Sequence, residues 1–482
     1  MSRQFVRIES QKQQSWTAIF RSPTDPRRSA VRLEWIECQM EFLPRRNALA
    51  LVGTAVLAAG AGLLASGCQQ DGPFSETDLA MLRTFALSPL GPDGSNSSAD
   101  VALAAKLGKQ LYFDTRISGP LGPYDVRGTN GSLGNAGDTG KVGCISCHDP
   151  ANGGSDHRSQ PAATSLGAGY TPRNSPTVIN AAYAPLWQFW DGRVDSLWSQ
   201  ALAPPEGANE CNGSRLAVAH LIATDYAAAY VAIFGPLPDI SGFPASGKPG
   251  DPAFDGLTSD DQKTINRIFA NFGKAIAAYE RRLVSPAFSP SPFDEFLAGK
   301  SDSLSPAAMA GAKIFIGRGG CAECHRGPLF SDLSFHNIGA PQEGEHAAIT
   351  DVGRYDGIAA VQANPFNRGS EFSDERTNDH LTGLTASDDD IGRFKTPTLR
   401  NVSKTAPYMH DGAYPGLWDV VNHYNFGGET GLYSGDTDPA INPLLLSNED
   451  LDNLIEFLGS LADGDPLPTA DFPEGLTANP QP

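Results

Sequence analysis

The sequence has little of what would indicate a β-rich or disulfide-bonded protein. Runs in which apolar and polar residues alternate are scarce, and such alternation is what predicts a half-buried strand. Only 7 cysteines occur in 482 residues, which leaves little room for a disulfide framework. We therefore predict a mainly α fold.

Basic side chains are also in short supply. The chain holds 36 Lys and Arg against 55 Asp and Glu, a formal net charge of −19. Basic residues outnumber acidic ones in residues 1–67, so the rest of the chain is more acidic still. Such a field repels nucleic acid and favours a basic partner through electrostatic steering. We therefore expect no nucleic-acid binding.

Long hydrophobic runs are limited to one, residues 47–67, which follows Arg45 and Arg46 and ends at Cys68. A charged start, an apolar stretch and a small-residue cleavage site are the parts of a secretory signal. Its length alone would also permit a retained membrane span, which the nearby cleavage site disfavours. Leu64-Ala65-Ser66-Gly67-Cys68 resembles a lipobox, so residues 40–67 are predicted to be a lipoprotein-like signal peptide.

The same reading predicts where the mature protein resides. We expect Cys68 to carry a lipid anchor to the bacterial envelope and the protein to be periplasmic; cleavage without lipid is the alternative. Residues 1–39 carry no targeting signal and are interpreted as an extension from an upstream start codon.

Two copies of one five-residue pattern are the strongest signal in the chain. They are Cys144-Ile145-Ser146-Cys147-His148 and Cys321-Ala322-Glu323-Cys324-His325. Cys-x-x-Cys-His attaches a c-type haem: two thiols bond to the porphyrin, and the histidine supplies an axial nitrogen to iron. A zinc site or a disulfide pair would not require the histidine directly after the second cysteine. We predict two covalently bound c-type haems, and Cys211 is left without a role.

The surroundings of the haem motif also occur twice. A helix and a loop precede each copy, which indicates two cytochrome c-like domains, each with one covalently bound haem. Ser305 as N-cap and Pro306 at the first position begin the helix before the second motif. Asp100 is expected to cap the helix before the first motif.

These signals divide the chain into segments. A long helix is predicted over Ser259–Arg282, and a proline-rich hinge follows at Pro286–Pro292. The predicted segments are a tether (68–99), an N-terminal haem domain (100–285), a C-terminal haem domain (293–463) and a disordered tail (464–482).

Four further stretches resemble the bacterial di-haem cytochrome c peroxidases and their MauG-type relatives. They occur in order around the two haem motifs, over roughly residues 100–465. They are Arg173-Asn174-Ser175-Pro176-Thr177, Gln188-Phe189-Trp190-Asp191-Gly192-Arg193, Phe394-Lys395-Thr396-Pro397-Thr398-Leu399-Arg400-Asn401 and Thr405-Ala406-Pro407-Tyr408-Met409-His410-Asp411-Gly412.

The resemblance implies that the N-terminal haem is the peroxidatic one. Many members close its distal face with the histidine of a Ser-Ile-Gly-His stretch, which here reads Ser165-Leu166-Gly167-Ala168. Alanine cannot bind iron, so the resemblance implies an open site, with His157 as the alternative closing ligand.

Proton transfer during O–O cleavage needs a positioned acid–base group. The family uses a glutamate twenty residues after the inter-haem tryptophan, which here is Glu210 after Trp190. Gln200 and Pro204 match the family's distal glutamine and proline. Glu206 is the alternative base.

Trp190 matches the tryptophan that the family places between the haems, where an indole can carry an electron over a distance too long for direct tunnelling. Trp187 and Trp198 flank it, and any of the three could be a core aromatic residue.

The sixth ligand of the second haem decides the subtype, and four residues are candidates: Met409, His410, His423 and Tyr424. The apolar face of the helix from Leu417 includes Tyr424, whereas His423 is rotated by about 100°. MauG-type members have a tyrosine fourteen residues after the histidine that matches His410, a position that falls on Tyr424. A phenolate ligand lowers the haem potential, whereas a thioether raises it.

The resemblance also implies a calcium ion between the domains. The family's ligands match the Asn174 side chain and the backbone carbonyls of Thr405 and Pro407, and oxygen ligands suit calcium. A turn at Asn174-Ser175-Pro176 is the alternative interpretation.

Three functions are consistent with this sequence. The first is an exported di-haem peroxidase that reduces hydrogen peroxide at the N-terminal haem and oxidises a partner protein through a His/Tyr C-terminal haem. The second is a detoxifying peroxidase that draws electrons from a small cytochrome. The third is a non-enzymatic electron-transfer cytochrome, which Ala168 disfavours. MauG has a surface tryptophan two residues before the second motif, but Gly319 stands there, so the same partner is not expected.

Overall fold

The computed structural model describes residues 73–123, 132–159, 164–344, 346–348, 350–429 and 435–465. All of them belong to one compact unit that begins at Cys68. The predicted extension, signal peptide and Cys68 anchor lie outside the described residues. Among the described residues, no single helix is long and apolar enough to cross a membrane; one pair of helices passes only when joined across a 98° bend.

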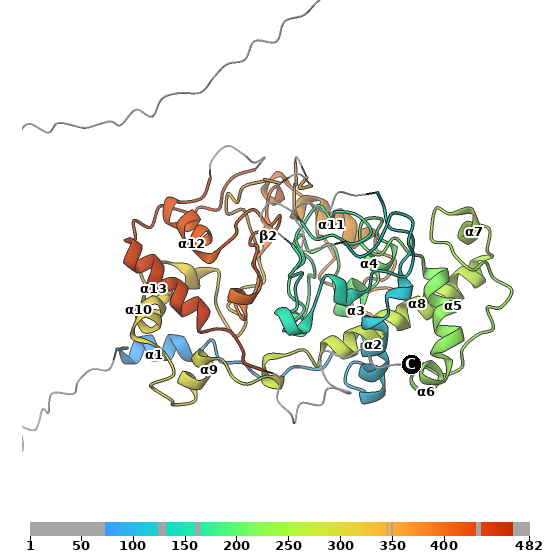
Figure 1. Cartoon of the computed structure of the whole chain (residues 1–482), viewed down its shortest axis with the longest axis horizontal. Helices are drawn as coiled ribbons and strands as arrows, with labels where there is room; N and C mark the ends of the chain where they lie inside the picture. The colour runs from blue at the N-terminus through green and yellow to red at the C-terminus, as the bar shows by residue number, and fades with distance from the viewer. Residues whose placement is uncertain are drawn as a thin grey trace, which may run out of the picture. The chain divides into compact units, whose positions relative to one another are not determined.

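The described residues are mostly helical, as predicted, with a single two-stranded sheet among them (Figure 1). The sheet pairs β1 (Phe335–His336) with β2 (Phe394–Lys395) in antiparallel register. The helices are α1 (Glu76–Arg83), α2 (Ala102–Phe113), α3 (Leu197–Gln200), α4 (Ala203–Glu206), α5 (Arg215–Asp225), α6 (Ala227–Phe234), α7 (Pro252–Asp255), α8 (Ser259–Glu280), α9 (Pro292–Leu297), α10 (Pro306–Ile316), α11 (Arg354–Ala363), α12 (Leu417–Phe426) and α13 (Asn448–Gly459).

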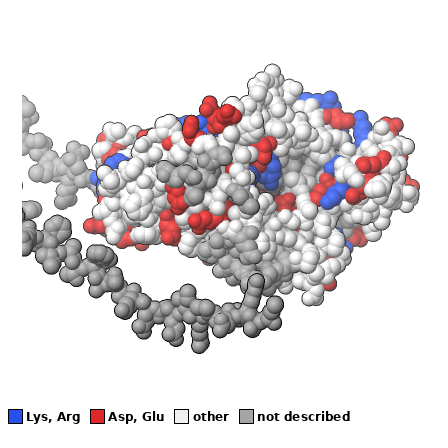
Figure 2. Space-filling view, turned by 90° about the horizontal axis from the view of Figure 1, so that it is seen from above, with Lys and Arg blue, Asp and Glu red and all other residues white. Residues whose placement is uncertain are grey.

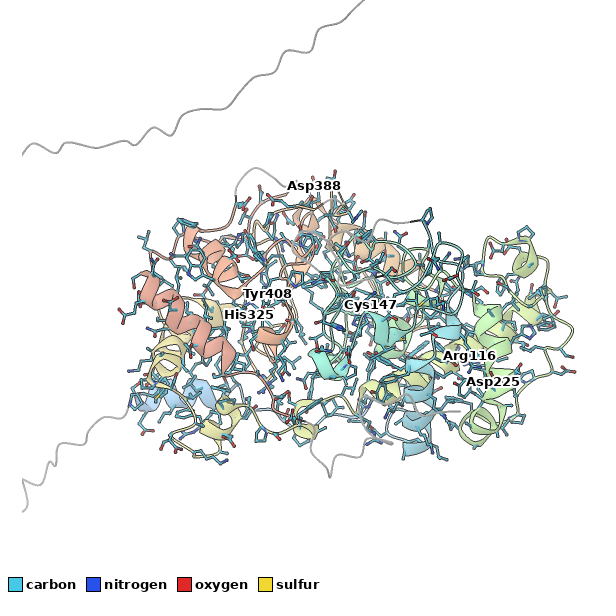
Figure 3. All side chains as sticks on the ribbon, in the orientation of Figure 1. Arg116, Cys147, Asp225, His325, Asp388 and Tyr408 are labelled. Atoms are coloured by element: carbon cyan, nitrogen blue, oxygen red, sulfur yellow. The ribbon has the colours of Figure 1, made fainter. Side chains whose placement is uncertain are left out.

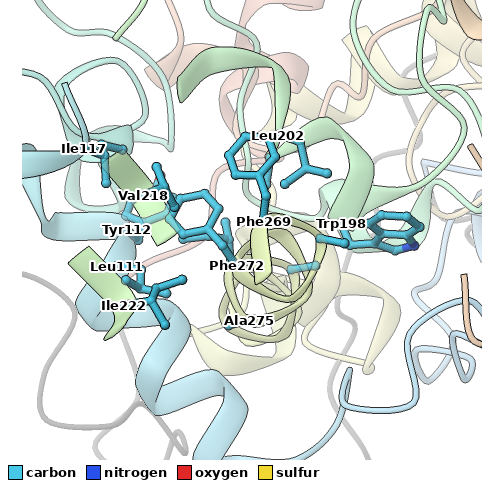
Figure 4. Close-up of a cluster of buried hydrophobic side chains, with 14 of the residues drawn as sticks. Leu111, Tyr112, Ile117, Trp198, Leu202, Val218, Ile222, Phe269, Phe272 and Ala275 are labelled. Atoms are coloured by element: carbon cyan, nitrogen blue, oxygen red, sulfur yellow. The ribbon is translucent and has the colours of Figure 1, made fainter. Parts of the chain in front are cut away.

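The first hydrophobic core surrounds α8, where the predicted long helix is confirmed to within two residues of its end. Thr258 caps its N-terminus by accepting a hydrogen bond from the Asp261 amide, and the helix is then buried from Ile268 onward. Side chains from α2, α3 and α5 pack around it, as the labelled cluster in Figure 4 shows. Gly108 of α2 lies against α8 so closely that a Cβ there would be 1.8 Å from the Ala275 carbonyl oxygen.

The second core repeats this arrangement with different helices. Ser305 accepts a hydrogen bond from the Ala308 amide, and α10 begins at Pro306 as predicted. Helix α10 packs on α13, and Gly311 provides the close approach: a Cβ there would be 1.9 Å from the Asn453 carbonyl oxygen. Each haem motif therefore follows a helix that a glycine holds tightly against a second helix.

Asp100 does not cap the helix before the first motif. The N-cap residue of α2 is Val101, which makes no side-chain capping bond. The Asp100 carboxylate instead accepts hydrogen bonds of 2.8–3.0 Å from Arg281, just after α8. The prediction was wrong because a long-range ion pair competes for the carboxylate.

The predicted tether is wrong from Phe74 onward, because this segment is packed. Phe74, Leu82 and Phe85 are buried in the second core, and the Phe85 ring stacks on Phe330 with centroids 4.4 Å apart. Further along, Asn96 donates a 3.0 Å hydrogen bond to the Lys274 carbonyl of α8. The segment therefore contacts both cores, and apolar burial outweighs its Gly/Ser-rich composition.

The two predicted domains exchange other segments as well. Phe366 and Phe372, from the C-terminal part of the sequence, are buried in the first core, where Phe366 meets Phe269 edge-on. A cut at the predicted hinge therefore does not separate the two cores.

The hinge region itself is fixed by a buried polar network. Ser285 donates a 2.6 Å hydrogen bond to Asp463, Asn180 donates one of 2.7 Å to Ser285, and Asn401 donates one of 2.7 Å to Asp463. Gly464 and Asp465 continue the contact through backbone bonds to Ser289, so the predicted disordered tail begins too early. Residues 466–482 lie outside the described part.

Candidate functional site

The two haem motifs adopt the same turn. Each begins with a short 3-10 helix, η2 (Cys144–Ser146) and η6 (Cys321–Glu323). The amide of His148 donates to the Cys144 carbonyl at 2.9 Å, and that of His325 to the Cys321 carbonyl at 2.8 Å. Cys147 and His325 mark the two sites in Figure 3. The fold thus presents two Cys-x-x-Cys-His turns of matching geometry.

In both motif histidines the hydrogen bond of Nδ1 leaves Nε2 as the nitrogen that can bind iron. Nδ1 of His148 lies 3.4 Å from the Gly154 carbonyl oxygen, and Nδ1 of His325 lies 2.8 Å from that of Phe330. A carbonyl only accepts hydrogen bonds, so Nδ1 carries the hydrogen and Nε2 keeps its lone pair. Burial also lowers the pKa of both imidazoles, which favours the neutral form that a metal ligand must have.

Near the first motif, Ala168 lies directly beside Glu210. The Ala168 amide donates a 2.6 Å hydrogen bond to the Glu210 carbonyl oxygen, and the Gly169 amide donates to Asn209 at 3.0 Å. Arg158 holds the same loop through a 2.6 Å bond to the Leu166 carbonyl. The loop that closes the distal face in many family members is thus fixed against the predicted acid–base residue.

The surroundings of Glu210 suit proton transfer. Burial raises the pKa of its carboxyl, and the positive charge of Arg193 partly opposes that shift. The Glu210 charge in turn adds to the raised pKa of the Cys144 and Cys147 thiols, whose main cause is burial. The carboxylate therefore lies close to the first motif.

The two alternatives on this side are disfavoured by their surroundings. Glu206 uses both carboxylate oxygens to bind the guanidinium of Arg215, at 2.8 and 2.6 Å. The side chain of His157 is 51% exposed and lies 3.9 Å from Asp149. Neither arrangement resembles that of a distal ligand or base.

Gln200 and Pro204 lie on the short helices between Trp190 and Glu210. Gln200 ends α3, which Ser196 caps, and the Pro204 carbonyl in α4 accepts a 3.1 Å bond from the Cys211 amide. Both are half-buried. The structure describes no further polar contact that would assign them a role.

Trp190 connects segments from both halves of the sequence. Its indole N–H donates a 2.9 Å hydrogen bond to the Asn174 carbonyl, and its own carbonyl accepts one of 2.7 Å from the Lys395 amide of β2. The backbone N–H of Asn174 in turn donates a 2.7 Å hydrogen bond to the His410 carbonyl. Trp190 is therefore built into the contact between the segments that carry the family motifs.

Charges distinguish Trp190 from its two neighbours. The guanidinium of Arg354 lies 4.3 Å from the Trp187 ring centroid, and the Lys274 ammonium lies 5.6 Å from that of Trp198. A cation over an indole face opposes loss of an electron from that ring. The Trp190 N–H faces a carbonyl oxygen instead, whose negative end favours positive charge on the indole.

Sequence reasoning assigned no role to an ion-pair network beside Trp190. Arg173 binds Asp191 at 2.5 Å and Asp351 at 2.7 Å, with all three side chains largely buried. The charges of Arg193 and Arg173 hold the pKa of Asp191 below its usual range, and the hydrogen bond and charge of Arg173 do the same for Asp351, both against the effect of burial. Arg173 and Asp191 stand in the family-like stretches, which was the available signal, but Asp351 is distant in sequence.

The predicted calcium ligands meet in part. The side-chain nitrogen Nδ2 of Asn174 donates a 2.8 Å hydrogen bond to the Pro407 carbonyl. The buried side-chain oxygen Oδ1 of Asn174 has no hydrogen-bond partner among the described residues. An unpartnered buried amide oxygen beside a carbonyl is a donor set that suits a hard cation. Thr405 lies in the same segment, with its amide bonded to Val402.

Near the second motif, the surroundings separate the four candidate ligands. Burial raises the pKa of Tyr424, and the charges of Cys321 and Cys324 add to that shift, so the phenol lies close to the motif. His423 is engaged on both ring nitrogens, by Tyr414 and by the Ile338 carbonyl, at 3.0 Å each. The His410 ring stacks on Phe394 at 3.8 Å, and its backbone bonds to Asn174. Met409 has a φ of 72°, in the left-handed region.

A metal-binding group of a different kind also includes one motif cysteine. Atoms of Cys324, Asp332 and His336 that could bind a metal lie within 4.8 Å of one another. Both ring nitrogens of His336, however, already contact carboxylates: Nε2 lies 3.1 Å from Asp332 Oδ2, and Nδ1 lies 2.7 Å from Asp438 Oδ2. Three ligands are also one fewer than a structural zinc site needs, so the haem interpretation of Cys324 is preferred.

Comparison with known proteins agrees with these observations. Residues 102–302 match the family described as di-haem cytochrome c peroxidase. A cytochrome-c peroxidase, IdrP1 of Denitromonas iodatirespirans, is 32% identical over 398 residues, which cover 79% of this chain and 88% of the relative. The methylamine utilization protein MauG of Methylorubrum extorquens is 28% identical over 389 residues, covering 80% and 86%.

A solved structure has a similar fold. The diheme peroxidase BthA from Burkholderia thailandensis aligns with a TM-score of 0.54 at 22% identity, covering 82% of this chain and 94% of that one. The chain belongs to the di-haem cytochrome c peroxidase family, which confirms the resemblance drawn from its motifs. It is accordingly a haem oxidoreductase with two c-type haems, and hydrogen peroxide is its oxidant.

Proposed function

We propose that this peroxidase reduces hydrogen peroxide at its N-terminal site and uses the oxidising equivalents, relayed through the C-terminal site, to oxidise a partner. A c-type haem bound at each motif supplies the redox chemistry. His148 Nε2 would hold the first iron, and His325 Nε2 and the Tyr424 oxygen would hold the second. The observation that carries the proposal is the backbone bond that fixes Ala168 against Glu210.

In this proposal the residues around the first site divide the work. Ala168 leaves the distal face without a protein ligand, so peroxide can approach. Glu210 takes a proton from the near peroxide oxygen and returns it to the departing one, a role that a half-buried carboxyl with a raised pKa suits. Gln200 and Pro204 shape the same face.

Trp190 is proposed to carry electrons between the two sites. Its N–H bond to the Asn174 carbonyl fixes the ring and favours positive charge on it. A calcium ion bound by Asn174 Oδ1 and the carbonyls of Thr405 and Pro407 would hold the same segment in place. The unpartnered Oδ1 supports this assignment.

Tyr424 is proposed to give the second site its low potential, since an anionic oxygen ligand stabilises oxidised iron. Such a site is a poor acceptor for electrons from an ordinary cytochrome, and this favours oxidation of a partner side chain. We further propose export to the periplasm and a lipid anchor at Cys68, on the sequence signals alone.

A second candidate function is detoxification of peroxide with electrons from a small cytochrome. The cytochrome-c peroxidase name of the relative at 32% identity supports it. So does the acidic surface, where Asp and Glu are spread over the face shown in Figure 2 and would steer a basic cytochrome.

Spectroscopy of the purified ferric protein, before and after addition of hydrogen peroxide, tests the proposal. We expect one high-spin, five-coordinate iron signal beside one low-spin signal, and a persistent peroxide-induced change at both. Rapid turnover with reduced cytochrome c and no persistent change would favour the second candidate. Two low-spin iron signals that do not change after addition of hydrogen peroxide would contradict both candidate functions.

A further inference from the structure

A tyrosine–histidine pair lies beside Tyr424 and has no part in the function proposed above. Nε2 of His423 is 3.0 Å from the Ile338 carbonyl oxygen, which can only accept a hydrogen bond. Nε2 therefore carries the hydrogen, and the lone pair of Nδ1 faces the Tyr414 hydroxyl at 3.0 Å. Tyr414 thus donates its hydroxyl proton to a base.

The pair is in ring contact with Tyr424. The ring centroids of His423 and Tyr424 are 5.4 Å apart, and those of Tyr414 and His423 are 5.6 Å apart. One imidazole therefore separates the Tyr414 phenol from the residue proposed to hold the second iron. Glu429 Oε1 is a second and more distant acceptor for the Tyr414 hydroxyl, at 3.4 Å against 3.0 Å for His423 Nδ1, and the charge of this carboxylate would balance positive charge on His423.

We propose that Tyr414 is a redox-active tyrosine that gives an electron to the second haem site while its hydroxyl proton moves to Nδ1 of His423. The inference rests on the proposed function, because peroxide reduced at the first site is the oxidant. Tyr414 becomes a neutral phenoxyl radical and His423 an imidazolium. An external one-electron donor, such as a phenol or an aromatic side chain of a partner, restores the tyrosine as the proton returns.

The electrons balance over two such steps. One hydrogen peroxide takes up two electrons and two protons from solvent to become two water molecules. Tyr414 therefore turns over twice for each peroxide, and two molecules of a one-electron donor are oxidised. Tyr414 is half-buried, so part of the residue faces solvent, from which such a donor would approach.

Tyr408 provides a matched control. It pairs with Tyr414 across an isolated antiparallel bridge and is also half-buried. Its hydroxyl donates a 3.0 Å hydrogen bond to the Val402 carbonyl, however, and a carbonyl does not take up a proton as an imidazole does. Loss of an electron from Tyr408 would leave the proton without a base. The proposal therefore assigns the radical to Tyr414 and not to Tyr408.

Freeze-quenched electron paramagnetic resonance of the haem-loaded protein after addition of hydrogen peroxide tests this. We expect an organic radical signal that narrows when the protein carries ring-deuterated tyrosine. The signal should be lost in Tyr414→Phe and kept in Tyr408→Phe. A purely structural role for the Tyr414–His423 bond would leave the wild-type protein without a tyrosyl signal, or leave that signal in Tyr414→Phe, and either result would overturn the inference.

Two further readouts keep the test decisive. If Tyr414→Phe fails to fold, a spin trap on the wild-type protein, mapped by mass spectrometry, should label Tyr414; a label on other tyrosines alone would overturn the proposal. The iron signals report separately on the proposed function. If they respond to peroxide while no radical forms at Tyr414, this inference alone fails; if they do not respond, both fail.

Discussion

The two haem sites of this chain are alike on one side of the iron position and different on the other. Each has a helix held close by a glycine, a Cys-x-x-Cys-His turn, and a histidine whose Nδ1 faces a backbone carbonyl. In the assignment proposed here, the opposite side of the first site has Ala168 and Glu210, whereas that of the second has Tyr424, which lies beside His423 and Tyr414. The attachment chemistry is therefore common, and under this proposal the opposite side would set the function of each site.

The largest effect is expected when Glu210 loses its ability to transfer protons. Glu210→Gln should slow the peroxide reaction at the first site by about 10² to 10⁴-fold, since general acid–base catalysis contributes that much. Stopped-flow absorbance with the haem-loaded variant measures it. Glu206→Gln is the control, because Glu206 is bound to Arg215 and should leave the rate near wild type. Unchanged kinetics in Glu210→Gln would remove Glu210 from the mechanism.

The difference between the sites should shrink if the first is given a side-chain ligand. Ala168→His places an imidazole on the loop that is fixed against Glu210. If it occupies the iron in 99% of molecules, peroxide access falls by about 100-fold. Ferric-state electron paramagnetic resonance should then show two low-spin signals in place of one. Persistence of the high-spin signal would mean that this loop does not face the iron.

The close helix contact that both sites share can be disrupted with a matched pair of substitutions, one at each contact. Gly108→Ala and Gly311→Ala each force a Cβ to within 1.8–1.9 Å of a carbonyl oxygen on the facing helix. Each should reduce the free energy of unfolding by about 1–3 kcal/mol, the usual cost of overpacking. Urea denaturation measures it. Gly459→Ala in α13 is the control and should not destabilise, because outside its own helix no heavy atom lies within 4 Å of the added Cβ.

Measured per pH unit, the smallest effect is the change in stability that comes from buried charge, in which the two sites also differ. Near the second motif, hydrogen bonds from the Ser334 amide and from His336 hold the pKa of Asp332 low against burial. Near the first motif, burial raises the pKa of Glu280 from 4.5 to about 8. Because Glu280 is neutral when folded and ionised when unfolded, stability falls as pH rises from about 4.5 to about 8. The fall is at most about 1.4 kcal/mol per pH unit.

Glu280→Gln should remove this loss of folding stability with rising pH, because the glutamine side-chain amide does not ionise. Urea denaturation at pH 5, 6.5 and 8 compares the wild type with the variant. An equal pH dependence in the two proteins would show that Glu280 is already ionised in the folded state.

Local signals in the sequence predicted the elements that depend on local chemistry. Ser305, Pro306 and the 259–282 periodicity predicted α10 and α8, and the Cys-x-x-Cys-His motifs marked both turns. Long-range contacts were not visible in the same way. Nothing local indicates that Phe85 stacks on Phe330, that Asp100 pairs with Arg281, or that Asp351 joins Arg173.

In the candidate site, too, sequence patterns identified the residues but not the long-range contacts that position them. Glu210, Trp190, Asn174 and Tyr424 came from their spacing within stretches similar to the family, and their roles stay proposals. The partners that fix them, such as the Ala168 amide on Glu210 or the Asn174 carbonyl on Trp190, depend on how separate loops meet. Tyr414 had no sequence signal at all, because its hydrogen bond to His423 arises only when α12 packs beside the 408–414 turn.

A crystal structure of the haem-loaded ferric protein would test the difference between the two sites most directly. The account predicts no protein atom bound to the first iron on the side of Ala168 and Glu210, and the Tyr424 oxygen bound to the second iron opposite His325. A side chain bound to the first iron on that side, or any other atom in place of the Tyr424 oxygen, would contradict it.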